Sequence, residues 1–276
     1  MFECDGKSLR YIYLKKKSRA RQRPTYHCGI TTDSTLVLPQ NAIFFQGKGI
    51  LRMKNKTQII KRSPYRRDVY LAKLIDGARR TKIDEYPTIE PWMVAKDLPK
   101  EIVQWDQRKA CKNLSETALS FYSEDSTFNA VLSDPERYLD VCRQYGCVIG
   151  TDASPYDNMP LVVQKSQIFL NLAITYFYGR RGIKVIPNVR LGDIRTITSL
   201  EAYPKNTLIS IGTNGFTKEL ANRQLFADEV GKIVECLEPN GIIAYGLAPD
   251  WLFEKALEKN IPVYQYDSYM MRRNRR

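Results

Sequence analysis

The sequence contains a single histidine, His27, and this scarcity excludes most histidine-dependent chemistry. A Ser-His-Asp or Cys-His mechanism would have to use this one residue, which lies in the basic N-terminal part of the chain. A metal site built from several histidines is excluded. A zinc site from Cys4, His27, Cys28 and Cys111 can be drawn, but its spacing matches no standard ligand pattern. Unliganded thiols are the simpler interpretation.

Paired cysteines and long apolar runs are also missing. The six cysteines form no C-x-x-C pair and no dense framework, which favours reduced thiols in a cytoplasmic protein. The most apolar stretch, 161–178, is interrupted by four polar residues at 164–167 and is too polar to span a membrane. The first five residues lack the basic and then apolar pattern of a secretory leader. We therefore expect a cytoplasmic protein with no membrane partner.

Positive charge is in excess, and nearly all of the excess lies near the N-terminus. The first 82 positions hold 20 of the 43 Lys and Arg residues and 5 of the 30 acidic residues, a net charge of +15. The other 194 positions hold 23 basic and 25 acidic residues, a net charge of −2. A concentrated positive field is typical of proteins with a polyanionic partner, most often nucleic acid. The sequence therefore predicts nucleic acid as the partner.

The basic residues are densest at 15–24, where tyrosines flank them at Tyr11, Tyr13 and Tyr26. Positive charge within reach is all that phosphate contacts need, and tyrosines can stack on unpaired bases. A localisation-like or merely solubilising run is the alternative. Short strands are expected between 35 and 60, with a hairpin at Gly47 to Gly49. The predicted nucleic-acid-binding residues are Lys15, Lys16, Lys17, Arg19, Arg21, Arg23, and, on one face of a strand, Arg52 and Lys54.

The domain organisation follows from charge and prolines. Three prolines at 87, 91 and 99 interrupt regular structure, so 84–100 is expected to be a linker. It would join a basic, β-rich, nucleic-acid-contacting region at 1–83 to an α/β domain at 101–276. A helix is also expected at 68–77 in the first region.

The C-terminal two-thirds alternates strand and helix patterns. Strands are expected at 118–122, 147–152, 183–187, 207–212, 241–246 and 262–266. Helices are expected at 135–145, from Asp157 or Asn158 as N-cap to 179 or 182, at 218–237 and at 250–259. This alternation predicts an α/β fold with a mainly parallel sheet flanked by helices. Periodicity leaves open whether the sheet is open or partly barrel-like.

Polar residues follow the ends of the predicted strands. Parallel strands end at one edge, where α/β proteins place ligands. The candidate catalytic residues are Asp152, Asp125 and Tyr245. The remaining candidates for a ligand-binding rim are Ser154, Asp157, Asn188, Arg190, Thr213 and Asn214. Asp152 is the first choice as general base or metal ligand, and the carboxylates could hold Mg²⁺. They could equally cap helices or form turns.

Several sequence runs resemble the domain of unknown function 4417 family. They are 121–128, 135–139, 154–160, 182–187 and 245–246, and the resemblance covers about 98–267. Gly150 to Ser154 stands where the family tends to have Ser-Pro-Asp-Phe-Ser, and Arg190-Leu191 where it favours a tryptophan. The resemblance implies a phage or mobile-element setting and no particular activity.

Three functions fit these observations. The first is a DNA- or RNA-binding protein of a phage or mobile element, with the basic region holding phosphates and the rim forming a second polar site. The second is an α/β enzyme that acts on a nucleotide or phosphodiester through the rim carboxylates, with Mg²⁺ as a candidate cofactor. The third is an interaction module whose basic arm binds an acidic protein.

Overall fold

The computed structural model describes residues 43–46, 49–52, 72–214 and 220–274, and the chain divides into two compact units, 1–66 and 67–276. In the first unit, β1 (Ile43–Gln46) pairs antiparallel with β2 (Gly49–Arg52), with Gln46 opposite Gly49. The antiparallel pairing of the two strands of the expected hairpin is confirmed, and the rest of 35–60 lies outside the described residues. The basic run at 15–24 and Lys54 lie outside the described residues, so their role stays a prediction.

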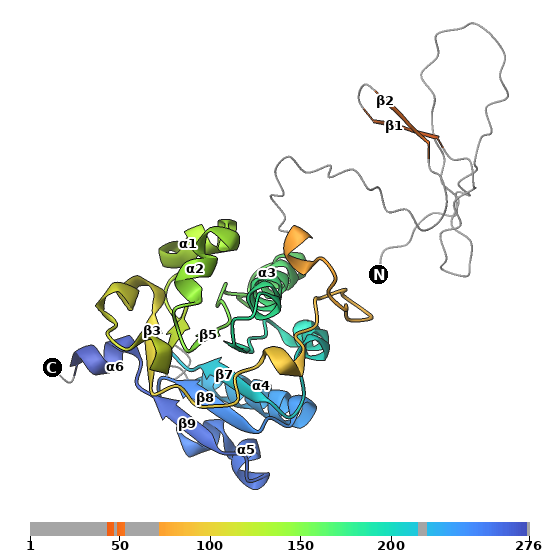
Figure 1. Ribbon diagram of the computed structural model, residues 1–276. Helices are drawn as coiled ribbons and strands as arrows, with labels where there is room; N and C mark the ends of the chain where they lie inside the picture. Colours follow the sequence, from red (N-terminus) through yellow and green to blue (C-terminus); the bar gives the residue numbers. More distant parts are fainter. Residues whose placement is uncertain (1–42, 47–48, 53–71, 215–219, 275–276) are drawn as a thin grey trace, which may run out of the picture. The chain divides into compact units, whose positions relative to one another are not determined.

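Two parallel sheets form the framework of the second unit (Figure 1). The first contains β3 (Glu101–Gln104), β4 (Thr117–Ser120), β5 (Cys147–Ile149) and β6 (Val185–Ile186). The second contains β7 (Leu208–Gly212), β8 (Gly241–Tyr245) and β9 (Val263–Tyr266). Each sheet keeps its strands in chain order, and a parallel bridge between Asn188 and Ser210 joins the two. The predicted parallel α/β fold is confirmed.

The sheet surface curls, so strands distant in the order meet through their side chains. Tyr122, just after β4, shares a 2.7 Å hydrogen bond between its hydroxyl and Ser210 Oγ on β7. Its ring stacks on Tyr245 of β8, with 4.8 Å between ring centroids. On β9, the Tyr266 hydroxyl donates to the carbonyl of Pro99, just before β3, at 2.6 Å. These contacts show a partly closed, barrel-like arrangement.

Helices connect the parallel strands. The α-helices are α1 (Asp125–Ser133), α2 (Leu139–Cys142), α3 (Leu161–Arg180), α4 (Leu220–Leu237), α5 (Glu254–Glu258) and α6 (Tyr269–Asn274). The 3₁₀ helices are η1 (Ala72–Ile75), η2 (Pro91–Met93), η3 (Trp105–Ala110), η4 (Leu114–Glu116), η5 (Pro135–Tyr138), η6 (Ile194–Ala202) and η7 (Asp250–Leu252). In Figure 1, α1, α2 and α3 lie beside the first sheet, and α4 and α5 beside the second.

The strands and α3 supply much of the core. β5 and β8 are buried along their whole length, which is typical of parallel strands covered on both faces. Their sequences are nearly continuous apolar runs, as such burial requires. Within the described residues, no helix is both long enough and apolar enough to cross a bilayer.

The segment 84–100 packs into the second unit, contrary to the expected linker. Tyr86, Ile89 and Met93 are buried, and Val94 forms a parallel bridge with Val185 of β6. The amide of Ala95 also donates to the carbonyl of Val185 at 2.9 Å. The prolines of 84–100 therefore separate short packed stretches. The boundary between the two units lies earlier in the chain, between residues 66 and 67.

The start of α3 also differs from the expectation. The helix begins at Leu161 with Pro160 as N-cap, and no side chain caps it. Asp157 therefore lies before the helix and not at its N-cap. The reason is Gln164, whose side-chain amide donates to the carbonyls of Asp157 at 3.1 Å and Met159 at 2.8 Å. These bonds hold the preceding residues in a turn that replaces a first helical turn.

Candidate functional site

A cavity of about 540 Å³ opens at the carboxyl ends of β4, β5 and β7. Its walls are formed by Tyr122, Ser123, Glu124, Asp125, Ser126, Asp152, Ser154, Tyr156, Arg190, Gly212 and Asn214. Five of the rim residues expected from sequence are therefore brought together, namely Asp125, Asp152, Ser154, Arg190 and Asn214. This is the edge of a parallel sheet where α/β proteins bind ligands. What these residues do there stays a prediction.

An ion pair between Asp152 and Arg190 lies in the cavity wall. Arg190 Nη1 is 3.1 Å from Asp152 Oδ2 and 3.3 Å from Oδ1, and Asn188 Nδ2 donates to Oδ1 at 2.9 Å. Only 9% of the Asp152 side chain is exposed. Burial raises the pKa of the Asp152 carboxyl, although Arg190 and Asn188 oppose that shift. Burial lowers the pKa of Arg190, but Asp152 and Glu229 more than compensate and raise it. Arg190 is therefore a fixed positive charge.

Glu229 on α4 is a further charged group beside this pair, and it was missed by the sequence analysis. Its Oε1 accepts a hydrogen bond from the amide of Leu191 at 3.0 Å. Burial raises the pKa of Glu229 to about 7, against the opposing effects of the Leu191 amide and Arg190. One feature could have revealed it. Glu229 lies three residues after Phe226 and four before Ile233, so it is an acid on the apolar face of the predicted helix.

Asp125 joins two of the elements that form the cavity. It is the first residue of α1, where a carboxylate interacts favourably with the helix dipole. Its Oδ2 accepts from the amide of Ser154 at 3.2 Å, and its Oδ1 accepts from Ser154 Oγ at 3.3 Å. These bonds tie the loop after β5 to the start of α1. Asp125 thus has a structural role as well as a place in the cavity wall.

The loop that carries Asp152 is held by Asn171 of α3. Asn171 Oδ1 accepts from Thr151 Oγ1 at 3.0 Å and from the amide of Ala153 at 2.8 Å. Its Nδ2 donates to the carbonyl of Ala153 at 2.9 Å. One buried amide therefore fixes the residues on both sides of Asp152, which orients the carboxylate toward Arg190.

Four of the expected rim residues do not line the cavity. Tyr245 is fully buried, stacks on Tyr122, and accepts from the amide of Tyr269 at 3.0 Å through its hydroxyl oxygen. Thr213 is buried and donates to the carbonyl of Tyr245, and Asn188 lies beneath Asp152. Asp157 belongs to the turn before α3. These side chains support the cavity from below or from the side.

The donor set of the cavity does not suit Mg²⁺. Within the described residues, no group of three or more His, Cys, Asp and Glu side chains could hold a metal ion. Three carboxylates line the cavity, namely Glu124, Asp125 and Asp152, and both oxygens of Asp152 already face Arg190. A guanidinium in that place competes with a cation.

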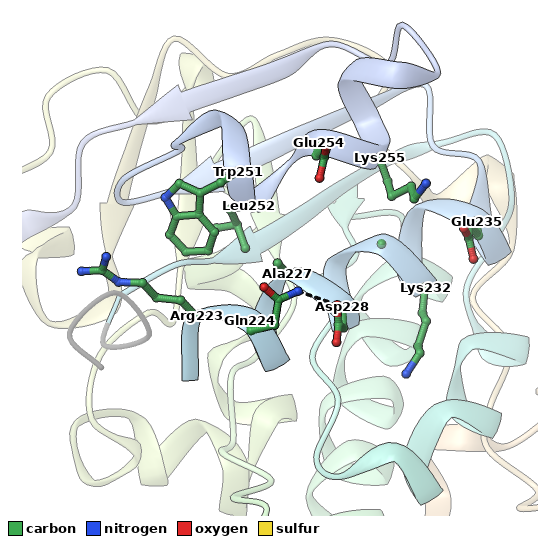
Figure 2. Close-up of a pocket in the computed structure, with 11 residues that line it drawn as sticks. Arg223, Gln224, Ala227, Asp228, Lys232, Glu235, Trp251, Leu252, Glu254 and Lys255 are labelled. Carbon is green, nitrogen blue, oxygen red and sulfur yellow. Dashed lines mark hydrogen bonds between the residues drawn. The ribbon is translucent and has the colours of Figure 1, made fainter. Parts of the chain in front are cut away.

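A second hollow of about 740 Å³ lies on the outer surface, between α4 and the segment from η7 to α5. Figure 2 shows acidic and basic side chains interspersed along it, with Trp251 near Arg223 at one end. Gln224 Nε2 donates to Asp228 Oδ1 across one helical turn at 3.0 Å. None of the residues predicted from sequence lines this hollow, and its mixed charges favour no one class of ligand.

Comparison with known proteins finds relatives that are encoded by phages. It is 25% identical over 154 residues to the Gene 1 protein of Mycobacterium phage L5, covering 54% of this chain and 66% of that protein. It is 22% identical over 195 residues to the Gene 1 protein of Mycobacterium phage D29, covering 69% of each. The chain thus spans about two-thirds of the length of these relatives. No solved structure matches it. Residues 83–267 match the profile of the family described as Domain of unknown function (DUF4417), so the chain belongs to this phage-associated family.

Proposed function

We propose that this protein binds nucleic acid, with the basic segment 1–82 as its main contact and the carboxyl-end cavity as a second polar site. The observation that carries the proposal is the separation of charge. The first 82 residues have a net charge of +15, and the other 194 have −2. A field of this kind attracts polyanions and releases their counterions on binding. Relatives encoded by phages are in keeping with such a partner.

The described residues of the cavity offer little with which to hold phosphates. Among them Arg190 is the one basic residue that lines the cavity, and it is ion-paired with Asp152. Glu124 and Asp125 add negative charge to the same wall. Affinity for the phosphate backbone is therefore assigned to the N-terminal segment, while the cavity takes some other part of the ligand.

The test is a salt titration of binding to labelled DNA and RNA of mixed sequence. The test variant replaces Lys15, Lys16, Lys17, Arg19, Arg21 and Arg23 with Gln. We expect weaker binding to every sequence and a flatter salt dependence, because each lost phosphate contact removes about 0.7–0.9 from the slope of log K against log salt.

A charge-matched control replaces six exposed basic residues of the α/β unit with Gln. The six are Lys96, Lys109, Lys112, Lys205, Lys259 and Arg273. This variant should keep the wild-type slope. An equal loss in both variants would show that overall charge matters and not the N-terminal segment, and it would overturn the proposal.

An enzyme is the second candidate, and the charged groups beneath the cavity favour it. Asp152, Arg190 and Glu229 are titratable groups with perturbed pKa values next to one cavity, an arrangement common at active sites. Asp125 is the better candidate for a general base acting on a nucleotide or phosphodiester, because it lines the cavity without facing Arg190.

The enzyme candidate is tested by product analysis. The protein is incubated with mixed nucleotides and short DNA and RNA oligonucleotides, and the products are followed by mass spectrometry. Turnover that disappears in Asp125→Asn, while the variant still folds and melts cooperatively, would support it. The absence of any product from wild-type protein in every mixture would remove it.

A further inference from the structure

The charges of the carboxyl-end cavity determine which part of a nucleic acid can enter it. In the part of the chain that the structure describes, three acids, Glu124, Asp125 and Asp152, line the cavity beside one base, Arg190. Arg190 is paired with Asp152, so an entering phosphate would meet the negative charges of Glu124 and Asp125. A neutral group that donates hydrogen bonds fits this wall far better than a phosphate does.

Nucleobases differ in the donors that they offer to such a wall. Adenine, cytosine and guanine carry exocyclic amino groups, whereas thymine and uracil present carbonyl oxygens in their place, and carboxylates accept from the amino group of cytosine. Both oxygens of Asp125 accept one bond each from Ser154, at 3.2 and 3.3 Å, and each keeps a further lone pair. Asp125 can therefore accept from an amino group without giving up its bonds to Ser154.

An exposed aromatic side chain lies in the wall of the polar cavity. Tyr156 lines the cavity and is 54% exposed, so its ring is accessible to a stacking partner. Unpaired bases stack on aromatic side chains, so Tyr156 can stack on a base that enters the cavity.

We infer that the cavity receives one unstacked nucleobase of a single-stranded nucleic acid, stacked on Tyr156 and donating its amino group to Asp125. The inference rests on the proposed function and names the part of the ligand that the cavity recognises. A volume of about 540 Å³ is in the range of small-molecule sites and accommodates one nucleotide. The site selects cytosine and other amino-bearing bases over thymine and uracil.

The experiment uses the full chain and an oligothymidylate in which only the central base is changed. We expect a central cytosine to bind about tenfold more tightly than a central thymine, as one charge-assisted hydrogen bond allows. A central 2-aminopurine also carries an exocyclic amino group and should likewise bind more tightly than a central thymine. These measurements on the wild-type protein do not depend on any variant folding.

Two variants with matched controls then locate the site. Asp125→Asn should abolish the preference for cytosine over thymine and leave the salt slope unchanged. The control is Asp97→Asn, a substitution of an exposed acid before β3, and it should preserve the preference for cytosine. Tyr156→Ala should weaken binding to all single strands. Trp92→Ala is the control and should not weaken binding. Trp92 is as exposed as Tyr156, but it lies next to the start of β6 and not at the carboxyl ends of the strands.

The outcomes separate this inference from the proposed function. Failure of the wild-type chain to bind any nucleic acid would overturn both. Salt-dependent binding with equal affinity for cytosine and thymine, and no effect of Tyr156→Ala, would overturn the cavity inference alone. A lysine-rich peptide is also titrated. If it binds in an Asp125-dependent way while oligonucleotides do not, the cavity is a site for a cationic peptide and the inference is wrong.

Discussion

At the scale of single residues, the charged side chains around Arg190 explain how a buried carboxylate can lie in a cavity wall. Arg190 and Asn188 stabilise the negative charge of Asp152. Asp152 and Glu229 in turn stabilise the positive charge of Arg190. Removing one member of a buried ion pair leaves the other charge in a medium that solvates it poorly. The residues of this group should therefore affect stability as well as any function.

Asp152→Asn keeps the shape of the side chain and removes the charge that faces Arg190. We expect a loss of about 3 kcal/mol in the free energy of unfolding, at the lower end of the range for broken buried pairs because Glu229 also acts on Arg190. Urea denaturation of Asp152→Asn, Arg190→Gln and the double variant measures it. The double variant should be more stable than the sum of the single effects predicts. Strictly additive effects would show that the pair does not interact.

Glu229→Gln tests the titration of this half-buried acid. The pKa of Glu229 is raised to about 7 in the folded protein, from an ordinary value of 4.5, so the folded state holds the proton more tightly. Stability from this group is present below about pH 4.5 and is lost as pH rises toward about 7. The melting temperature of Glu229→Gln minus that of wild type should therefore increase between about pH 5 and about pH 8. Glu235→Gln, exposed on the same helix, is the control. A difference that does not change with pH would contradict the raised pKa of Glu229.

At the scale of elements, α3 determines the shape of two loops through two buried amides. Gln164 holds the turn before the helix, and Asn171 holds the residues on both sides of Asp152. The helix itself was predicted, because its long apolar pattern ends in glycines. Its start was not, because the bonds of Gln164 to the carbonyls of Asp157 and Met159 are tertiary contacts that no local pattern reveals.

Asn171→Ala should loosen the loop that carries Asp152. The amide of Ala153 and the hydroxyl of Thr151 lose their acceptor, which we expect to cost about 1–3 kcal/mol. Hydrogen exchange at the Ala153 amide should become faster, while Ser166→Ala on the exposed side of α3 should leave it slow. Unchanged protection at Ala153 would mean that Asn171 does not hold the loop.

At the scale of the whole molecule, the two units should differ in how they fold. Residues 67–276 form one compact unit, and its core includes Leu74 and Ile75 of η1. We expect a fragment 67–276 to melt cooperatively by circular dichroism. A fragment that begins at residue 84 lacks both side chains and should melt at a lower temperature. Equal melting temperatures would show that η1 adds nothing to the core.

Much of the parallel fold could be predicted from sequence, and the reasons are physical. Buried parallel strands such as β5 and β8 are apolar runs between turn residues, so they can be recognised from the amino-acid sequence alone. β3 was missed because its four residues, Glu101 to Gln104, form a short run without polar–apolar alternation that follows three prolines. The cavity edge followed from strand ends alone. The inward position of Tyr245 and the contribution of Glu229 depend on curvature and on packing between α4 and the loop after β6, which periodicity does not encode.

The salt dependence of nucleic-acid binding by the full chain and by the fragment 67–276 tests the central proposal most directly. Both are titrated with the same labelled single strand over a range of salt concentrations. The full chain should lose affinity steeply with salt, with a slope of several units at about 0.7 per phosphate contact, and the fragment should bind weakly with a shallow slope. A fragment that keeps the full slope, or a full chain whose affinity does not change with salt, would contradict the assignment of phosphate binding to the N-terminal segment.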